Sequence, residues 1–166
     1  MSWAFVREGD GALDPLPDLP ISPHPDHVTP GGLAARHSRR QARQADLTAL
    51  RARPDRPNRL DKLPEAAAER DIRYLQARLR SALPIDPAQQ PLTAMAFGLT
   101  AVVADAAGQH HRSQIVGEDE ADASKGLIAP HSPLGQALIG AAPGDDLLWP
   151  RPAGAVRLTL ISLIRP

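Results

Sequence analysis

Proline positions divide the first half of this chain into segments that can and cannot form helices. Residues 1–28 carry repeated prolines, at Pro15, Pro17, Pro20, Pro23 and Pro25. Proline lacks a backbone donor and disfavours helix, so this density predicts an extended, largely unpaired leader. Thr29-Pro30 then predicts a helix start, because a hydroxyl can cap free amides and proline fits the first helical position.

Two helices are predicted between the leader and residue 83. The stretch from Pro30 to Ala52 has no further proline and is rich in helix-forming Ala, Arg, Gln and Leu. Pro54, Pro57 and Pro64 then mark a turn. From about Pro64 to Leu83, apolar residues step by four, three, four and three, at Ala68, Ile72, Leu75, Leu79 and Ala82. Residues 29–83 are therefore predicted to form an antiparallel helical hairpin, a short coiled coil.

The hydrophobic period changes after a linker at residues 84–94. The predicted elements are strands at 96–104, 109–116, 126–129, 146–149 and 155–164, and a short helix that begins at Ser132-Pro133. Asp105-Ala106-Ala107-Gly108 is expected to turn the first two strands into a hairpin. Strands with one inserted helix predict an α+β fold for residues 95–166.

Composition excludes several kinds of chemistry. The chain has no cysteine, so disulfides, thiolate metal sites and a cysteine nucleophile are excluded. Aromatic residues make up only 3% of the chain, which disfavours a large aromatic ligand pocket. No apolar run is long enough for a membrane span and no signal-peptide pattern is present, so a cytoplasmic protein without a cofactor is expected.

The net charge of zero conceals a basic segment. Residues 31–80 carry thirteen basic and six acidic side chains, a net charge of +7, whereas residues 1–30 carry −4 and residues 81–166 carry −3. This segment suits a polyanion, or an acidic surface or channel on a protein. A solvated helix face explains the same counts, and both interpretations stay open.

Four motifs occur in an order that resembles a known family. They are Gln114–Asp122, Lys125-Gly126, Ser132–Gly140 and Pro143–Asp146. Together they resemble the C-terminal domain of the GreA/GreB transcript cleavage factors over residues 95–164. Upstream, Thr29-Pro30 and the stretch from Arg70 to Leu79 are similar to the ends of that family's coiled-coil arm.

The resemblance implies an FKBP-like C-terminal domain that docks at the rim of the secondary channel of bacterial RNA polymerase. It also implies a helical arm that can enter the channel. The family's rim-contacting turn corresponds to His131, Ser132, Pro133 and Leu134, although the family often has aspartate where this chain has His131. The alternative role for Ser132-Pro133 is simply to cap a helix.

The predicted arm tip departs from the family pattern. Family cleavage factors carry an acidic tip whose carboxylates help to hold a catalytic Mg²⁺, as a hard cation requires. Here Asp55 and Asp61 are the only tip carboxylates, and arginines surround Asp55. The arm is also shorter by about a dozen residues shared between two helices, which withdraws the tip by roughly 10 Å. Weak or no stimulation of transcript cleavage is therefore expected.

The sequence as a whole predicts a monomeric RNA polymerase-binding elongation regulator that is not an enzyme. Short-armed family members described as nucleoside diphosphate kinase regulators are similar in arm length. Two alternatives stay open: an active cleavage factor using Asp55 or Asp61, and non-specific nucleic-acid binding by the basic arm, within the elongation complex or elsewhere. Prolyl isomerase activity is disfavoured, because only Phe97 and Trp149 offer aromatic rings in this domain. The adjacent His110 and His111 should point to opposite faces of a strand, so no metal site is expected there.

Overall fold

The computed structural model describes residues 15–54 and 62–166, and contacts divide the chain into two compact units. Within the described residues, the arm unit comprises the leader up to Ile21 together with Arg36–Arg80. The sheet unit comprises Ser22–Ala35 and Ser81–Pro166. The last part of the proline-rich leader and the first turn of the first helix therefore belong with the C-terminal sheet.

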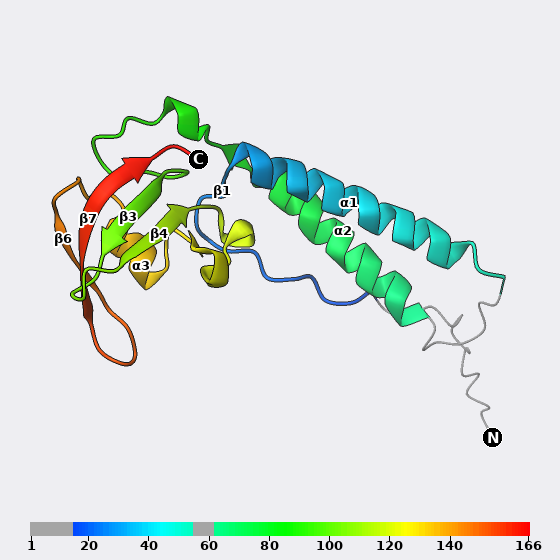
Figure 1. Ribbon diagram of the computed structural model, residues 1–166. Coiled ribbons are helices and arrows are strands. Elements are labelled where there is room, and N and C mark those ends of the chain that lie inside the picture. The colour runs from blue at the N-terminus through cyan, green and yellow to red at the C-terminus, as the bar shows by residue number, and fades with distance from the viewer. Residues whose placement is uncertain (1–14, 55–61) are drawn as a thin grey trace, which may run out of the picture. The chain divides into compact units, whose positions relative to one another are not determined.

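The predicted helical hairpin is present as α1 (Pro30–Arg51) and α2 (Leu63–Ser81), drawn in Figure 1. In the arm unit, Leu47 of α1 packs with Ala68 and Ile72 of α2 in a small buried cluster. Alanine at the contact lets the two helix backbones approach closely, which suits a seam with few large side chains. The predicted tip residues Asp55 and Asp61 lie outside the described residues.

The apolar seam of α2 departs from prediction towards the end of the helix. Ala68, Ile72 and Leu75 are buried as expected, but Leu79 and Ala82 are only half-buried. Arg78 is buried instead, with 2% of its surface exposed, and so is Arg36 of α1. The Arg36 guanidinium donates a hydrogen bond to the Arg78 carbonyl at 3.2 Å. A polar contact thus replaces the expected leucine contact in this part of the arm.

The leader was predicted to be extended and largely unpaired, and of its described residues only the last two form a paired strand. Residues 15–26 form no helix or strand, but β1 (His27–Val28) pairs in parallel with β2 (Leu83–Pro84). Leu83 donates its backbone N–H to the Asp26 carbonyl at 2.8 Å, and Ile85 donates to Val28 at 3.0 Å. Proline at Pro84 is tolerated because the ladder is only two residues long and uses the neighbouring amides.

A five-stranded sheet forms the core of the sheet unit and confirms the α+β fold. Its strands are β3 (Thr100–Ala104), β4 (His110–Ile115), β5 (Leu127–Ile128), β6 (Asp146–Trp149) and β7 (Val156–Ile164). Their order is β5-β4-β3-β7-β6, and β5 alone among these pairs in parallel. Three short 3₁₀ helices lie at Pro87–Gln89, Glu118–Glu120 and Ala123–Lys125.

Alternation along the strands places one face of the sheet in a shared core with α3 (Pro133–Leu138). The most buried members of this core are Leu99, Ala101, Ile115, Leu138 and Leu160, each fully inaccessible. Aliphatic side chains dominate this list, as expected from a sequence with so few aromatic residues. Burial of α3 against the sheet fixes the loop that leads into it, residues 129–132.

The predicted turn between β3 and β4 is a tight hairpin closed by Asp105. Its carboxylate accepts hydrogen bonds from the backbone N–H groups of Ala107 and Gln109, both at 2.9 Å. Gly108 has φ of 75°, a left-handed conformation that glycine adopts without strain.

Among the described residues, no helix has the length and apolar character needed to span a membrane.

Candidate functional site

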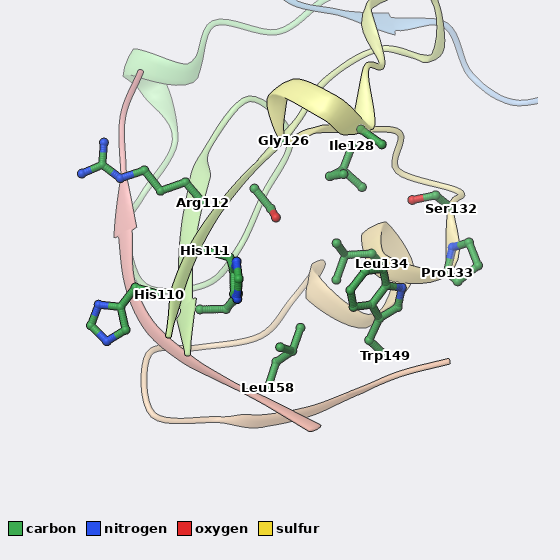
Figure 2. Close-up of a pocket in the computed structure, with 13 residues that line it drawn as sticks. His110, His111, Arg112, Gly126, Ile128, Ser132, Pro133, Leu134, Trp149 and Leu158 are labelled. Atoms are coloured by element: carbon green, nitrogen blue, oxygen red, sulfur yellow. The ribbon is translucent and has the colours of Figure 1, made fainter. Parts of the chain in front are cut away.

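A cavity of about 600 Å³ opens beside the sheet and the start of α3 (Figure 2). Its apolar lining comes from strands and from the α3 entrance: Val103, Ile128, Pro133, Leu134, Trp149 and Leu158. A mostly apolar hollow with a few polar groups at its edge is the usual form of a binding site for a small molecule or for an anchoring side chain of another protein. We refer to it as the α3 cavity.

Ser132 holds the wall of the α3 cavity in place by capping α3. Its hydroxyl accepts a hydrogen bond from the backbone N–H of Gly135 at 3.1 Å and donates to the Ala129 carbonyl at 2.7 Å. This is the helix-cap role that the sequence offered as an alternative to a contact role. A side chain at residue 135 would overlap the carbonyls of Ala129 and Pro130, so glycine is required there. The entrance to α3 is therefore closely packed.

The four predicted contact residues have different environments. Ser132, Pro133 and Leu134 all line the α3 cavity, and Figure 2 shows Leu134 next to Trp149. Pro133 is exposed, whereas Leu134 is 8% exposed and belongs to the core. His131 does not line the cavity, and its ring stacks instead on the ring of His24 at a centroid distance of 3.6 Å.

Histidines from β4 border the cavity on the other side. Figure 2 shows His111 directed towards the cavity, with His110 and Arg112 directed away from it. This agrees with the expectation that the adjacent His110 and His111 point to opposite faces of the strand. His111 Nε2 lies 3.1 Å from Asp105 Oδ2, and this hydrogen bond, helped by the Gln109 and Ala107 amides, lowers the pKa of the Asp105 carboxyl.

Trp149 is a cavity residue whose importance was not evident from the sequence. Trp149 is the last residue of β6 and is half-buried. The Arg151 guanidinium lies over its ring, 4.8 Å from the ring centroid, as in a cation–π contact. Phe97, the other aromatic residue weighed for this domain, is buried in the core and does not line the cavity. The signal that could have identified Trp149 is strand alternation, because exposed Leu148 precedes it and faces the opposite way.

The arm unit presents a basic surface that is partly neutralised by its own carboxylates. Arg43 lies 3.3 Å from both Asp46 and Asp71, and Arg70 lies 3.0 Å from Asp71. Arg73 pairs with Asp18 of the leader at 2.7 Å. Exposed ion pairs of this kind contribute about 1 kcal/mol or less to stability. They do, however, reduce the positive charge available to an external polyanion.

Comparisons with known proteins find a family match in the part of the chain that contains the α3 cavity. A family described as transcription elongation factor GreA/GreB, C-terminal domain, matches residues 90–165. The transcription elongation factor GreA of Psychrobacter sp. (strain PRwf-1) is 38% identical over 98 residues, which cover 58% of this chain and 62% of that relative. Residues 90–165 are therefore similar to the C-terminal domain of the GreA/GreB family.

Other relatives agree with this assignment. GreA of Xylella fastidiosa (strain M12) is 41% identical over 88 residues, which cover 52% of this chain and 56% of that protein. GreA of Pseudomonas putida is 33% identical over 101 residues, with 60% and 63% covered. The matches thus span less than two thirds of the length of these GreA relatives.

Solved structures of GreA/GreB-type proteins are similar over more of the chain but at low scores. The GreA/GreB factor from Nitrosomonas europaea has a TM-score of 0.41 at 21% identity, covering 82% of this chain and 97% of that one. The GreA factor homologue Gfh1 of Thermus thermophilus has a TM-score of 0.39 at 20% identity, covering 85% and 99%. The sequence match within the GreA/GreB C-terminal domain remains the deciding observation, and the α3 cavity lies entirely inside that domain.

Proposed function

We propose that this chain is a GreA/GreB-type transcription elongation regulator that binds bacterial RNA polymerase at the rim of its secondary channel. The GreA/GreB C-terminal domain supplies the docking surface, and the helical arm occupies the channel. The chain acts by binding and is not itself a catalyst. It stimulates transcript cleavage weakly or not at all.

The observation that carries this proposal is that the residues at the start of α3 line an apolar cavity. Ser132, Pro133 and Leu134, the positions that resemble the family's contact turn, form one wall of the α3 cavity next to Trp149. A fixed apolar hollow with an aromatic side chain accepts an anchoring residue of a partner protein at low entropic cost. The two part-buried hydrogen bonds of Ser132 constrain this wall before the partner binds.

Weak cleavage follows from the charge of the arm tip. Asp55 and Asp61 are the only carboxylates between Arg53 and Lys62, and Arg53, Arg56 and Arg59 lie in the same stretch. A hard divalent cation needs several oxygen ligands and is repelled by neighbouring guanidinium groups. The helices are also short, with 22 residues in α1 and 19 in α2. Both features oppose delivery of Mg²⁺ into the polymerase active site.

Direct nucleic-acid binding by the arm is less well supported. Arg43 and Arg73 are already paired with carboxylates of the chain, and the described arm residues include a single aromatic side chain, Tyr74. Phosphate contacts without base stacking give binding that is non-specific and falls steeply with salt. The arm's charge is therefore better explained by an acidic channel in a protein partner.

Prolyl isomerase activity is also disfavoured. Trp149 is the one Phe, Tyr or Trp residue in the described lining of the α3 cavity, whereas the notion of isomerase activity rests on a pocket lined by such residues and on fold analogy alone. Turnover of a short proline peptide by the purified chain would contradict this conclusion.

The proposed function is tested with backtracked elongation complexes. The full chain is added to complexes built from bacterial core RNA polymerase, and both co-elution with polymerase and shortening of the RNA 3′ end are measured. A cleavage-competent GreA factor serves as the positive control for shortening. We expect this chain to co-elute with polymerase and to shorten the RNA little above background.

The variants Asp55→Ala and Asp61→Ala separate the two cleavage hypotheses. Strong shortening that either substitution abolishes would identify the chain as an active cleavage factor and contradict the weak-cleavage part of the proposal. Absence of co-elution when the chain is present at micromolar concentration would contradict polymerase binding. Binding that both variants retain, without shortening, supports the proposal.

A further inference from the structure

Three potential metal-ligating side chains meet at the surface of the sheet unit, outside the α3 cavity. They are His24 of the leader, Glu118 of the 3₁₀ helix after β4, and His131 of the loop before α3. One ligand atom from each lies within 4.8 Å of the other two. We propose that these three residues form a binding site for a divalent transition-metal ion of the zinc class.

The donor set selects the class of metal. Two imidazoles and one carboxylate suit Zn²⁺ and its neighbours, whereas Mg²⁺ and Ca²⁺ prefer sites made only of oxygen. Zn²⁺ binds nitrogen at about 2.0–2.1 Å, so tetrahedral ligand atoms are roughly 3.3 Å apart. The observed separations need to contract by at most roughly 1.5 Å, which side-chain rotation provides. Three protein ligands leave the fourth position for water.

Hydrogen bonds already orient the side chains that would hold the ion. The Ser22 hydroxyl donates to Glu118 Oε1 at 3.0 Å and accepts the backbone N–H of His24 at 3.3 Å, so one residue positions two ligands. Such contacts behind the ligands are a regular feature of metal sites in proteins. Glu118 retains its second carboxylate oxygen for the ion.

The backbone around both histidines is also constrained. His24 lies between Pro23 and Pro25, which restrict the conformation of the leader on both sides. His131 precedes Ser132, the N-cap of α3, and the His131 carbonyl accepts a hydrogen bond from Gln136 Nε2 at 3.2 Å. The two rings are stacked with an interplanar angle of 18°. Little conformational entropy remains to be lost when an ion binds, which favours affinity.

Charge in this part of the sheet unit favours a cation. Glu118 begins a run that also contains Asp119, Glu120 and Asp122, and the single lysine near them, Lys125, pairs with Asp122 at 2.9 Å. The alternative interpretation is that the two exposed histidine rings form only a packing contact. That alternative predicts no dependence on metal. The site stands independently of the polymerase interaction proposed above.

Isothermal titration of the full chain with Zn²⁺ tests the site. The chain is prepared without a histidine tag and stripped with a chelator, so that neither the tag nor residual metal contributes to the titration. We expect one equivalent of Zn²⁺ to bind, and His24→Ala and His131→Ala each to weaken binding at least tenfold. His110→Ala removes an exposed histidine outside the cluster and is the matched control, which should bind as the unaltered chain does.

Further measurements separate ligand loss from unfolding and define the class of metal. Circular dichroism of the variants should match that of the unaltered chain, and Glu118→Gln should weaken zinc binding while the fold is retained. Millimolar Mg²⁺ should not displace Zn²⁺. The proposal is overturned if no zinc binds at 100 µM, if His24→Ala and His131→Ala bind as tightly as the unaltered chain, if His110→Ala weakens binding equally, or if Mg²⁺ displaces the ion.

Discussion

The carboxylate of Glu120 caps the first helix of the arm through Thr29, which lies 91 residues earlier in the chain. It accepts the backbone N–H of Thr29 at 3.1 Å and also the Thr29 hydroxyl. Thr29 Oγ1 in turn accepts the N–H of Gly32 at 2.9 Å, and Glu120 accepts the N–H of Gly117 at 3.0 Å. A negative side chain is thereby held at the positive end of α1.

Replacing Glu120 should therefore destabilise the sheet unit. In Glu120→Ala, the amides of Thr29 and Gly117 lose their acceptor, and Thr29 is only 9% exposed to water. We expect the free energy of unfolding in urea to fall by about 1–3 kcal/mol. Asp46→Ala removes an exposed carboxylate on α1 and should change it by less than about 0.5 kcal/mol. Equal effects of the two substitutions would contradict the capping role of Glu120.

The paired glycines at the start of α1 should respond oppositely to alanine. A Cβ at Gly31 would have one neighbour, Thr29 Oγ1 at an ordinary 3.8 Å, whereas a Cβ at Gly32 would overlap the Glu120 carboxylate. Gly31→Ala should raise the free energy of unfolding by about 0.5 kcal/mol, because alanine favours helix. Gly32→Ala should lower it by about 1–3 kcal/mol through overpacking. Thermal or urea unfolding of both variants measures this, and a stabilising Gly32→Ala would contradict the close approach of the Glu120 carboxylate to Gly32.

The Asp105–His111 contact should make the β3–β4 hairpin sensitive to acid. The pKa of Asp105 is lowered by its hydrogen bond with His111 and by the turn amides, so the folded state favours the carboxylate. A lowered folded pKa gives stability that is present above the unfolded value of about 3.9 and is lost as the pH falls through the folded value. Hairpin stability should hold down to about pH 4 and decline below it.

Removal of His111 should raise the pKa of Asp105 towards its ordinary value. Titration of the Asp105 carboxyl carbon by NMR in His111→Ala, with His110→Ala as control, measures the shift. His110 is adjacent in β4 but its side chain points away from the cavity. An unchanged pKa of Asp105 in His111→Ala would mean that the turn amides alone account for the lowered value.

Local features of this fold were predictable from the sequence because each depends on neighbouring residues. Ser132 caps α3 and the turn at residues 105–108 closes a hairpin, and both effects act over four or five residues. The α2 seam was correct at Ile72 and Leu75 for the same reason, since apolar spacing alone places them on one face.

Long-range pairings were not predictable, because no local pattern encodes them. The seam failed at Leu79, which is only half-buried, whereas the neighbouring Arg78 is buried. The Arg36 guanidinium donates to the backbone carbonyl of Arg78 across 42 residues of sequence, a contact that a rule about apolar spacing does not contain. The proximity of His24 to His131 likewise depends on how the leader returns to the sheet unit. Within the candidate site, the turn at Ser132–Leu134 was predicted from family resemblance. That Trp149 lines the same cavity depends on how the strands pair, so only the structure shows it.

Docking through the α3 cavity predicts a sharp difference between two adjacent residues of β6. Trp149 lines the cavity, and Leu148 is 64% exposed on the opposite side of the strand. Trp149→Ala and Leu148→Ala each remove a large apolar side chain, so Leu148→Ala is a matched control for Trp149→Ala. Circular dichroism melts establish that each variant is folded at the temperature of the binding measurement. Pro133→Ala, at an exposed position of the cavity wall, provides a second test that does not disturb the core.

The most direct test of the account is the dissociation constant of the full, fluorescently labelled chain for bacterial core RNA polymerase, measured by anisotropy for the unaltered chain, Trp149→Ala and Leu148→Ala. We predict binding by the unaltered chain, at least tenfold weaker binding by Trp149→Ala, and little change in Leu148→Ala. Failure of the unaltered chain to bind, or equal affinities of Trp149→Ala and Leu148→Ala, would contradict docking through the α3 cavity.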